Sequence, residues 1–351
     1  MQFANWERIQ QRYAALWDNE VLDRPMVSIR VRRDGVPPRA DDLPASEEWR
    51  RYMDEAFIYQ QMENQLTDTA YYGDAVPSMP LYLGTCAHGA YTQKLRYSVS
   101  SESVWLHPVM DGITDALTFN ADSEFLHTTN RIIEHCAARC GGRFLLSNTD
   151  NCSNLDALAS LRGINDLLLD MLDEPDAVTA RLVELDGILR RTEEDYASRL
   201  IPINGGGVMT DFMQLWSEGY HHQLQCDMAA MISPALFEEF AVPDLSRSAQ
   251  WMKKVVYHLD GQEQIKFLDM LFTVPNVKLI QWTPVDGQPP TSAFLPELKR
   301  IQAAGKGLVL FPTADELPLL LAELSPKGTI YVPRGIGTEE EARSIMRLFD
   351  K

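Results

Sequence analysis

The chain has 351 residues, of which 45% are hydrophobic and 23% are charged, as expected for a folded globular protein. Its 50 acidic and 32 basic side chains give a formal net charge of −18, which disfavours binding to nucleic acid or anionic lipid. No apolar run approaches the roughly 20 residues that cross a bilayer, and the N-terminus lacks the pattern of a secretory signal. We therefore expect a cytoplasmic protein without a membrane span, with its five cysteines reduced.

Residues 1–20 are predicted to form an amphipathic helix ahead of the first strand. Its apolar stripe consists of Trp6, Ile9, Tyr13, Leu16 and Trp17. Eight short apolar or β-branched runs follow, and each leads through a turn into a segment with a helical pattern. These runs are Pro25–Val31, Thr69–Asp74, Arg143–Asn148, Gly207–Met213, Lys254–Leu259, Val277–Trp282, Gly307–Phe311 and Thr329–Pro333.

This β-then-α alternation predicts an α/β fold, specifically a closed (β/α)8 TIM barrel, for which about 250 residues is typical. The surplus length lies in the N-terminal helix and in an irregular, aromatic-rich insertion over 75–140. Because no linker divides the chain, we expect a single domain over 1–351. An open doubly wound sheet is the alternative, but no Gly-x-Gly-x-x-Gly motif follows the first strand.

Polar residues stand at the predicted carboxyl ends of the strands, where the chemistry of such barrels collects. Arg30 and Arg32 are two apart and share a face, so they could grip a carboxylate or phosphate, or form salt bridges within the barrel. Asp74 lies at a bent strand end, either as a site residue or as a solvated turn residue. The acids Asp74, Asp150, Asp211 and Asp260 together predict a site that favours a cation.

His258 and Asp260 give the clearest chemical signal in the chain. They follow an apolar run and lie two apart on a predicted strand, so both face the same side of the sheet. An imidazole and a carboxylate in this arrangement could bind one metal ion or act as an acid and base pair. A lone strand histidine is often a core residue, but the aspartate two positions on favours a functional site.

A second cluster places four candidate ligands within seven residues, namely His221, His222, Cys226 and Asp227. Imidazole, thiolate and carboxylate groups suit zinc, yet the spacing matches no standard zinc module. The alternative is a loop that only covers the barrel mouth. A metal site would require one of these side chains to face His258.

Several segments resemble the uroporphyrinogen decarboxylase superfamily, and within it the corrinoid-dependent methyltransferase-like members called trimethylamine corrinoid protein 2-like. The segments that carry the resemblance are Asp23–Arg30, Tyr72–Pro77, Thr149–Asp150, Leu155–Asp156, Leu161–Gly163, Met231–Phe240 with Pro243, Tyr257–Gly261 and Ile280–Trp282. The resemblance implies a (β/α)8 barrel that moves a methyl group between a small substrate and a corrinoid on a partner protein.

The resemblance also implies roles for individual residues. Methyltransferases of this kind hold zinc through a His-x-Cys pair and a later cysteine; here His258 matches the histidine and Asp260 stands at the cysteine position. If zinc binds, the implied ligands are His258, Asp260, Cys226 and Asp227. From their positions at the ends of the predicted strands, we expect His258, Asp260 and Asp74 to be catalytic and Arg30, Arg32, Asp150, Asp211, Trp282 and Arg334 to bind substrate.

Two alternative functions remain open at this point. A lyase of the decarboxylase type would grip a carboxylated substrate with Arg30, Arg32 and Arg334. A non-catalytic protein would bind a tetrapyrrole or corrinoid against an aromatic mouth formed by Tyr72, Trp216, Tyr220 and Trp282.

Overall fold

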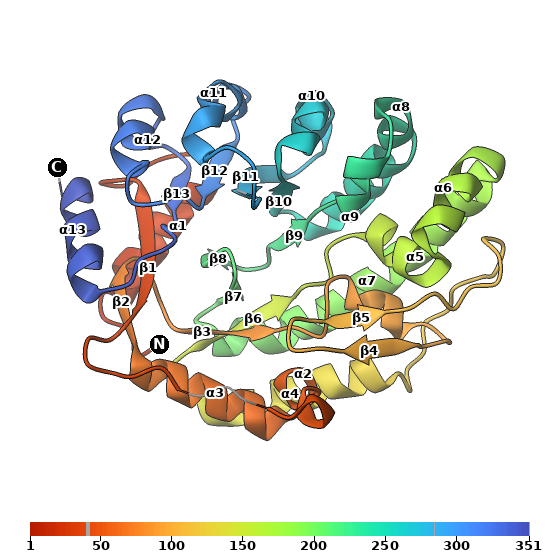
Figure 1. Cartoon of the computed structure of the whole chain (residues 1–351), viewed down its shortest axis with the longest axis horizontal. Coiled ribbons are helices and arrows are strands. Elements are labelled where there is room, and N and C mark those ends of the chain that lie inside the picture. The colour runs from red at the N-terminus through yellow and green to blue at the C-terminus, as the bar shows by residue number, and fades with distance from the viewer. Residues whose placement is uncertain (40–42, 284, 351) are drawn as a thin grey trace.

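The computed structural model describes residues 1–39, 43–283 and 285–350, and it shows an α/β fold in which helices surround parallel strands (Figure 1). One sheet has the order β2-β1-β13-β12-β11-β10-β9, a second has the order β3-β6-β7-β8, and β4 and β5 pair separately. The strands are β1 (Met26–Arg32), β2 (Thr69–Gly73), β3 (Ser78–Leu81), β4 (Tyr97–Val99), β5 (Val104–Leu106), β6 (Leu145–Thr149), β7 (Gly207–Thr210), β8 (Leu215–Glu218), β9 (His222–Leu224), β10 (Val255–Asp260), β11 (Val277–Thr283), β12 (Gly307–Leu310) and β13 (Thr329–Tyr331).

The parallel strands β10 to β13 alternate with helices, as the sequence pattern predicts. The helices are α1 (Trp6–Trp17), α2 (Arg50–Met53), α3 (Glu55–Asp68), α4 (Glu124–Cys140), α5 (Asn154–Arg162), α6 (Ile164–Asp173), α7 (Pro175–Ile203), α8 (Pro234–Leu236), α9 (Val242–Met252), α10 (Leu268–Thr273), α11 (Leu295–Ala303), α12 (Leu317–Glu323) and α13 (Glu339–Phe349). None of the described helices is both long enough and apolar enough to traverse a membrane.

The predicted closed barrel is wrong in one respect, because backbone hydrogen bonds among the described residues form two sheets instead of one ring. Side chains span the two seams. Between β1 and the segment that begins β3, the Arg30 guanidinium donates to the Val76 carbonyl at 3.0 Å and to Ser78 Oγ at 2.6 Å. Between β6 and β9, Asn148 Nδ2 donates to His222 Nδ1 at 2.8 Å. The fold is therefore TIM-barrel-like, with polar side chains at both seams.

The run Thr69–Asp74 does not form a barrel strand as predicted. Its β2 segment pairs antiparallel with β1, with Ser28 opposite Gly73 and Arg32 opposite Thr69. Strand β3, within the predicted insertion over 75–140, instead pairs in parallel with β6. Within Gly207–Met213, β7 pairs in parallel with β6 as predicted, but it also turns back into a hairpin with β8. Periodicity identifies an extended segment but not the direction in which it pairs.

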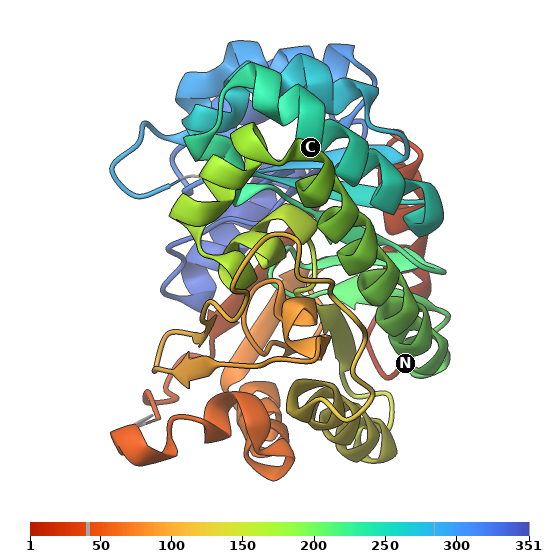
Figure 2. The same cartoon turned by 90° about the vertical axis from the view of Figure 1, so that its right-hand side faces the viewer.

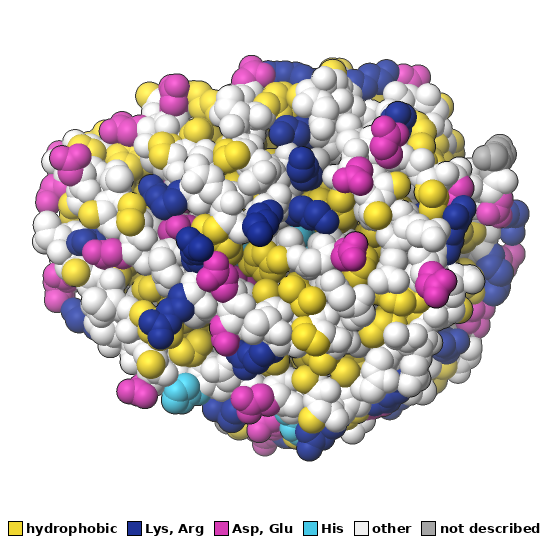
Figure 3. Space-filling model, turned by 180° about the vertical axis from the view of Figure 1, so that it is seen from behind, with side chains coloured by type: hydrophobic (Ala, Val, Ile, Leu, Met, Phe, Trp, Pro, Cys, Tyr) yellow, Lys and Arg dark blue, Asp and Glu magenta, His cyan; other side chains and the backbone are white. Residues whose placement is uncertain are grey.

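The N-terminal helix closes one end of the strands. All five residues of the predicted apolar stripe are buried in α1, which confirms the amphipathic helix. They pack against residues near the beginnings of the strands, which are Met26, Leu145, Val256, Leu279, Val309 and Ile330. In Figure 2 the red N-terminal segment lies on the right and the orange segment with β4 and β5 on the left. Figure 3 shows the molecule from the α1 side, with basic and acidic side chains interspersed among apolar ones.

Candidate functional site

A cavity of about 420 Å³ lies at the carboxyl ends of β6, β7 and β10, opposite the end that α1 closes. The face agrees with the location of sites in barrels of this type. Four of the predicted site residues line the cavity, namely Asp150, Asp211, Asp227 and His258. The other lining residues are Pro80, Leu81, Tyr82, Thr85, Ser147, Asn148, Thr149, Thr210, Phe212, Gln223 and Gln225.

His258 presents one free ring nitrogen in this cavity. Its Nδ1 contacts Gln281 Oε1, and Gln281 Nε2 in turn donates to Thr283 Oγ1 at 2.9 Å. In the tautomer that donates from Nδ1 to the Gln281 oxygen, the lone pair is on Nε2. Nε2 has no hydrogen bond within the described part of the chain, and the Phe212 ring meets the imidazole edge-on at 5.7 Å. The imidazole is therefore available to accept a proton or a hydrogen bond.

Asp150 follows β6 and projects a carboxyl group into the same cavity. Thr85 Oγ1 donates to its Oδ2 at 3.0 Å, and Gln223 Nε2 donates to Oδ1. Burial raises the pKa of Asp150 to about 6, although the hydrogen bonds and the positive charge of protonated His258 oppose the increase. The physical cause is desolvation, which penalises the charged form of the carboxyl group.

Asp227 carries a still higher pKa. Burial is the largest cause, and repulsion from Asp156, Asp260 and Asp150 adds to it, so the pKa rises to about 8. Gln225 Nε2 donates to Asp227 Oδ2 at 3.0 Å and partly opposes this increase. Asp227 is open to solvent, and its raised pKa makes its carboxyl group a candidate proton donor.

A second cavity of about 830 Å³ adjoins the first and shares Tyr82, Thr85 and Asp227 with it. Trp105 and Met231 line this second cavity and are each 54% exposed. Large apolar side chains that face solvent beside a polar cavity are typical of a surface that binds a partner or an extended ligand.

The predicted arginine grip is not formed. Arg30 donates to Asp211 Oδ1 at 2.8 Å, which is the salt-bridge alternative that the sequence left open. Arg32 is exposed and donates to the Pro37 carbonyl at 3.2 Å. Arg334 is also exposed, with its guanidinium 4.2 Å from the Phe311 ring centroid. None of these three arginines lines the 420 Å³ cavity.

Asp74, predicted to be catalytic, lies at the opposite end of the strands. Its carboxylate accepts hydrogen bonds from Arg12 and Arg24 at 2.7 Å each and from the Val27 amide at 3.1 Å. The structure places Asp74 away from the cavity, because β2 runs antiparallel to β1 and carries Asp74 to the beginning of β1.

Trp282, predicted to bind substrate, packs in the core with its ring 4.8 Å from that of Phe294. Strand register pairs Trp282 with Leu259 and Gln281 with His258. Trp282 therefore faces away from the side of the sheet that carries His258, since successive strand residues point to opposite faces. For this reason the structure does not bring Trp282 into the cavity.

The residues predicted as zinc ligands were His258, Asp260, Cys226 and Asp227. Asp227 and His258 share the cavity, but Cys226 is buried in the apolar core, and burial raises the pKa of its thiol well above the usual value. The described residues contain no group of three or more His, Cys, Asp or Glu side chains placed to hold a metal ion. The donor set does not fit zinc, which needs several deprotonated ligands around one point.

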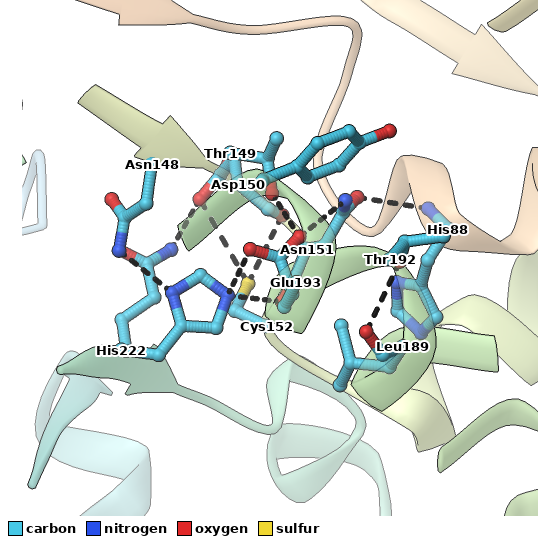
Figure 4. Close-up of polar contacts among 12 residues, drawn as sticks. His88, Asn148, Thr149, Asp150, Asn151, Cys152, Leu189, Thr192, Glu193 and His222 are labelled. Atoms are coloured by element: carbon cyan, nitrogen blue, oxygen red, sulfur yellow. Dashed lines mark hydrogen bonds and ion pairs between the residues drawn. The ribbon is translucent and has the colours of Figure 1, made fainter. Parts of the chain in front are cut away.

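A buried polar network behind the cavity was missed by the sequence analysis (Figure 4). Glu193 of α7 accepts from Thr149 and Asn151, and His222 contacts Asn148 and the Asn151 carbonyl. The available signal was a charged residue four positions after Leu189 on the buried stripe of α7. The cluster around residues 221–227 was recognised as polar, but His222 is held inside the protein and not at the mouth.

Comparison with known proteins gives a structural neighbour without close sequence similarity. The chain matches no protein-family description and no curated protein sequence. Its structure is similar to that of a methyltransferase from Methanosarcina mazei, with a TM-score of 0.58 and 11% sequence identity over 97% of this chain and 98% of that chain. At this identity the likeness shows a shared fold.

Proposed function

We propose that this protein is an enzyme that transfers a methyl group between a small substrate and a corrinoid on a partner protein. The observation that carries the proposal is the cavity in which His258 offers a free Nε2 beside the protonatable carboxyl groups of Asp150 and Asp227. The fold shared with a methyltransferase supports the same reaction class.

The cavity chemistry suits the proton movements of methyl transfer. When the bond between a methyl carbon and its heteroatom breaks, the electron pair stays on the heteroatom, which then takes a proton. Asp227, whose pKa is raised, lines the cavity and would supply that proton, while His258 Nε2 accepts a hydrogen bond from the substrate. In the reverse direction the same carboxylate recovers the proton. A bound corrinoid would supply the atom that exchanges the methyl group.

The lining residues favour a neutral or cationic substrate over an anionic one. Asp150, Asp211 and Asp227 contribute carboxyl groups, and no lysine or arginine lines the cavity. Arg30 is paired with Asp211, one of these three acids. An amine or ether carrying a methyl group fits this wall better than a polycarboxylate, which argues against the decarboxylase alternative.

The partner would approach across the second cavity. Exposed Trp105, Ile164 and Met231 line this second cavity, and Phe212, which is 43% exposed, lines the first. An apolar rim around a polar, proton-active cavity suits a carrier protein that must exclude water from the reacting groups. This arrangement supports a protein-bound corrinoid.

The test combines the wild-type protein with free cob(I)alamin and methylated amines, ethers and thiols, and follows the visible absorption of the corrinoid. We expect transfer from an amine or ether, and His258→Ala should lower the rate by about 100-fold or more. His127→Ala is the matched control, because His127 is an exposed histidine on α4.

The rate should also fall above about pH 8, where Asp227 loses its proton. Corrinoid binding without transfer from any of these substrates would contradict the proposal and support the non-catalytic alternative. Formation of coproporphyrinogen from uroporphyrinogen would support the lyase.

A further inference from the structure

On the side of β6 away from the cavity, one carboxylate oxygen of Glu193 on α7 accepts hydrogen bonds from the carboxyl end of the strand. Asp150 faces the cavity, and its two chain neighbours reach back to α7 (Figure 4). Thr149 Oγ1 donates to Glu193 Oε1 at 2.5 Å, and Asn151 Nδ2 donates to the same oxygen at 3.0 Å. The residues before and after Asp150 are thus fixed to one point on α7.

His222 holds the same segment from the side of β9. Its Nδ1 accepts from Asn148 Nδ2 at 2.8 Å, and its Nε2 donates to the Asn151 carbonyl at 2.8 Å. The second Glu193 oxygen, Oε2, lies 3.7 Å from His222 Nε2 and has no hydrogen bond. Both side chains are fully buried.

The buried Glu193 carboxylate is not explained by stability alone. A buried carboxylate oxygen without a hydrogen-bond partner carries a desolvation cost that an apolar side chain of similar size would avoid. Glu193 instead fixes the position of the strand end, because its Oε1 accepts hydrogen bonds from both residues that flank Asp150. The Asp150 carboxylate itself accepts hydrogen bonds from Thr85, Gln223 and Cys152, and none of these residues belongs to α7.

We propose that Glu193 and His222 are positioning residues that fix residues 148–151, so that Asn148 and Asp150 keep their places in the cavity wall. The catalytic part of this inference rests on the proposed function, which assigns Asp150 to the cavity where methyl transfer would occur. The structural part is that buried side chains hold the end of β6 rigid, and this rigidity can be measured without any substrate.

The experiment compares Glu193→Ala with Glu193→Gln and with Thr192→Ala. Glutamine keeps an oxygen that can accept from Thr149 and Asn151. Thr192 is the matched control because it is the adjacent buried residue of α7, and its hydroxyl donates only to the Ile188 and Leu189 carbonyls of the same helix, at 3.0 Å each.

Native-state hydrogen exchange reports how often the strand end opens, through the exchange rates of two backbone amides. The Cys86 amide donates to the Asp150 carbonyl at 2.9 Å, and the Gln225 amide donates to the Cys152 carbonyl at 3.2 Å. Glu193→Ala should speed exchange at both amides by about tenfold to hundredfold relative to the rest of the chain. Glu193→Gln should stay within about threefold of the wild type, and Thr192→Ala should not single out these two amides.

The titration of Asp150 gives a second readout, followed by the chemical shift of its carboxyl carbon. The pKa of about 6 in the wild type depends on burial, so it should fall toward the ordinary value of 3.8 in Glu193→Ala. If Glu193→Ala does not fold, Thr149→Val removes one donor to Glu193 while keeping the side-chain shape, and the same two measurements decide.

Unchanged exchange and titration in Glu193→Ala, or equal changes in Thr192→Ala, would overturn the inference. These results are separable from the fate of the proposed function. A loosened strand end in a protein that transfers no methyl group would leave the positioning role intact and remove only its catalytic purpose. Transfer by a Glu193→Ala protein at the wild-type rate, with a loosened strand end, would contradict the inference alone.

Discussion

Asp74 and Asp150 are both aspartates beside the central strands, yet the protein surrounds them with opposite environments. At the end closed by α1, Asp74 is fully buried and meets two guanidinium groups, those of Arg12 and Arg24. At the open end, Asp150 receives hydrogen bonds from Thr85 and Gln223 but has no arginine or lysine partner among the residues that the structure describes. Positively charged partners therefore compensate the negative charge of Asp74, whereas Asp150 has only neutral hydrogen-bond donors beside it.

The difference separates a structural carboxylate from a chemically active one. A buried charge that is paired and hydrogen-bonded stays ionised and ties segments together. An uncompensated carboxyl group has a raised pKa, and so it exchanges protons near neutral pH. Ion pairs therefore stabilise the closed end, whereas the open end holds a carboxyl group without a cation at some cost in stability.

The largest effect should come from breaking the compensated end. Asp74→Asn leaves two largely buried arginines without a carboxylate at this position, which should lower the free energy of unfolding by about 3–5 kcal/mol. Urea denaturation followed by circular dichroism measures this. Asp23→Asn is the control, because Asp23 pairs with Arg12 at the surface with 33% of its side chain exposed, and should cost less than about 1 kcal/mol. Equal losses would remove the distinction between buried and exposed pairs.

At the open end, replacing Asp150 should raise the free energy of unfolding instead of lowering it. The pKa of Asp150 in the folded protein, about 6, lies above the ordinary value of 3.8, so the folded state binds this proton more tightly. Its contribution to stability is complete below about pH 4 and is lost as the pH rises through 6.

Asp150→Asn cannot ionise, so at pH 8 it should be more stable than the wild type by up to about 3 kcal/mol, and equal to it near pH 4. Denaturant titrations of both proteins at the two pH values provide the measurement. Destabilisation at pH 8, as for Asp74→Asn, would mean that Asp150 is also compensated in the folded protein.

The smallest effect should come from the exposed arginine at the open end. Arg334→Ala removes a contact with the Phe311 ring and no ion pair to a described acid, so the unfolding free energy should change by no more than about 0.5 kcal/mol. Methyl transfer should be unaffected, because Arg334 does not line the cavity. A large loss of activity in this variant would instead favour an anionic substrate gripped by arginine.

Local patterns predicted much of the architecture. The apolar stripe of α1 and the strands from β10 to β13 follow from spacing of three to four residues and from alternation, both of which are properties of neighbouring residues. Alternation also placed His258 and Asp260 on one face. The errors arose where pairing direction mattered, as in β2, or where a strand was too short to recognise, as in β9.

The sequence by itself determined the N-terminal helix, the strands from β10 to β13, the acidic character of the chain and the presence of a histidine at a strand end. Only the tertiary structure decided which charges meet. Arg30 pairs with Asp211 across 181 residues of chain, and Arg12 pairs with Asp74 across 62. Such contacts depend on how sheets and helices pack and not on local spacing, so an aspartate that is structural and one that is proton-active look alike in the sequence.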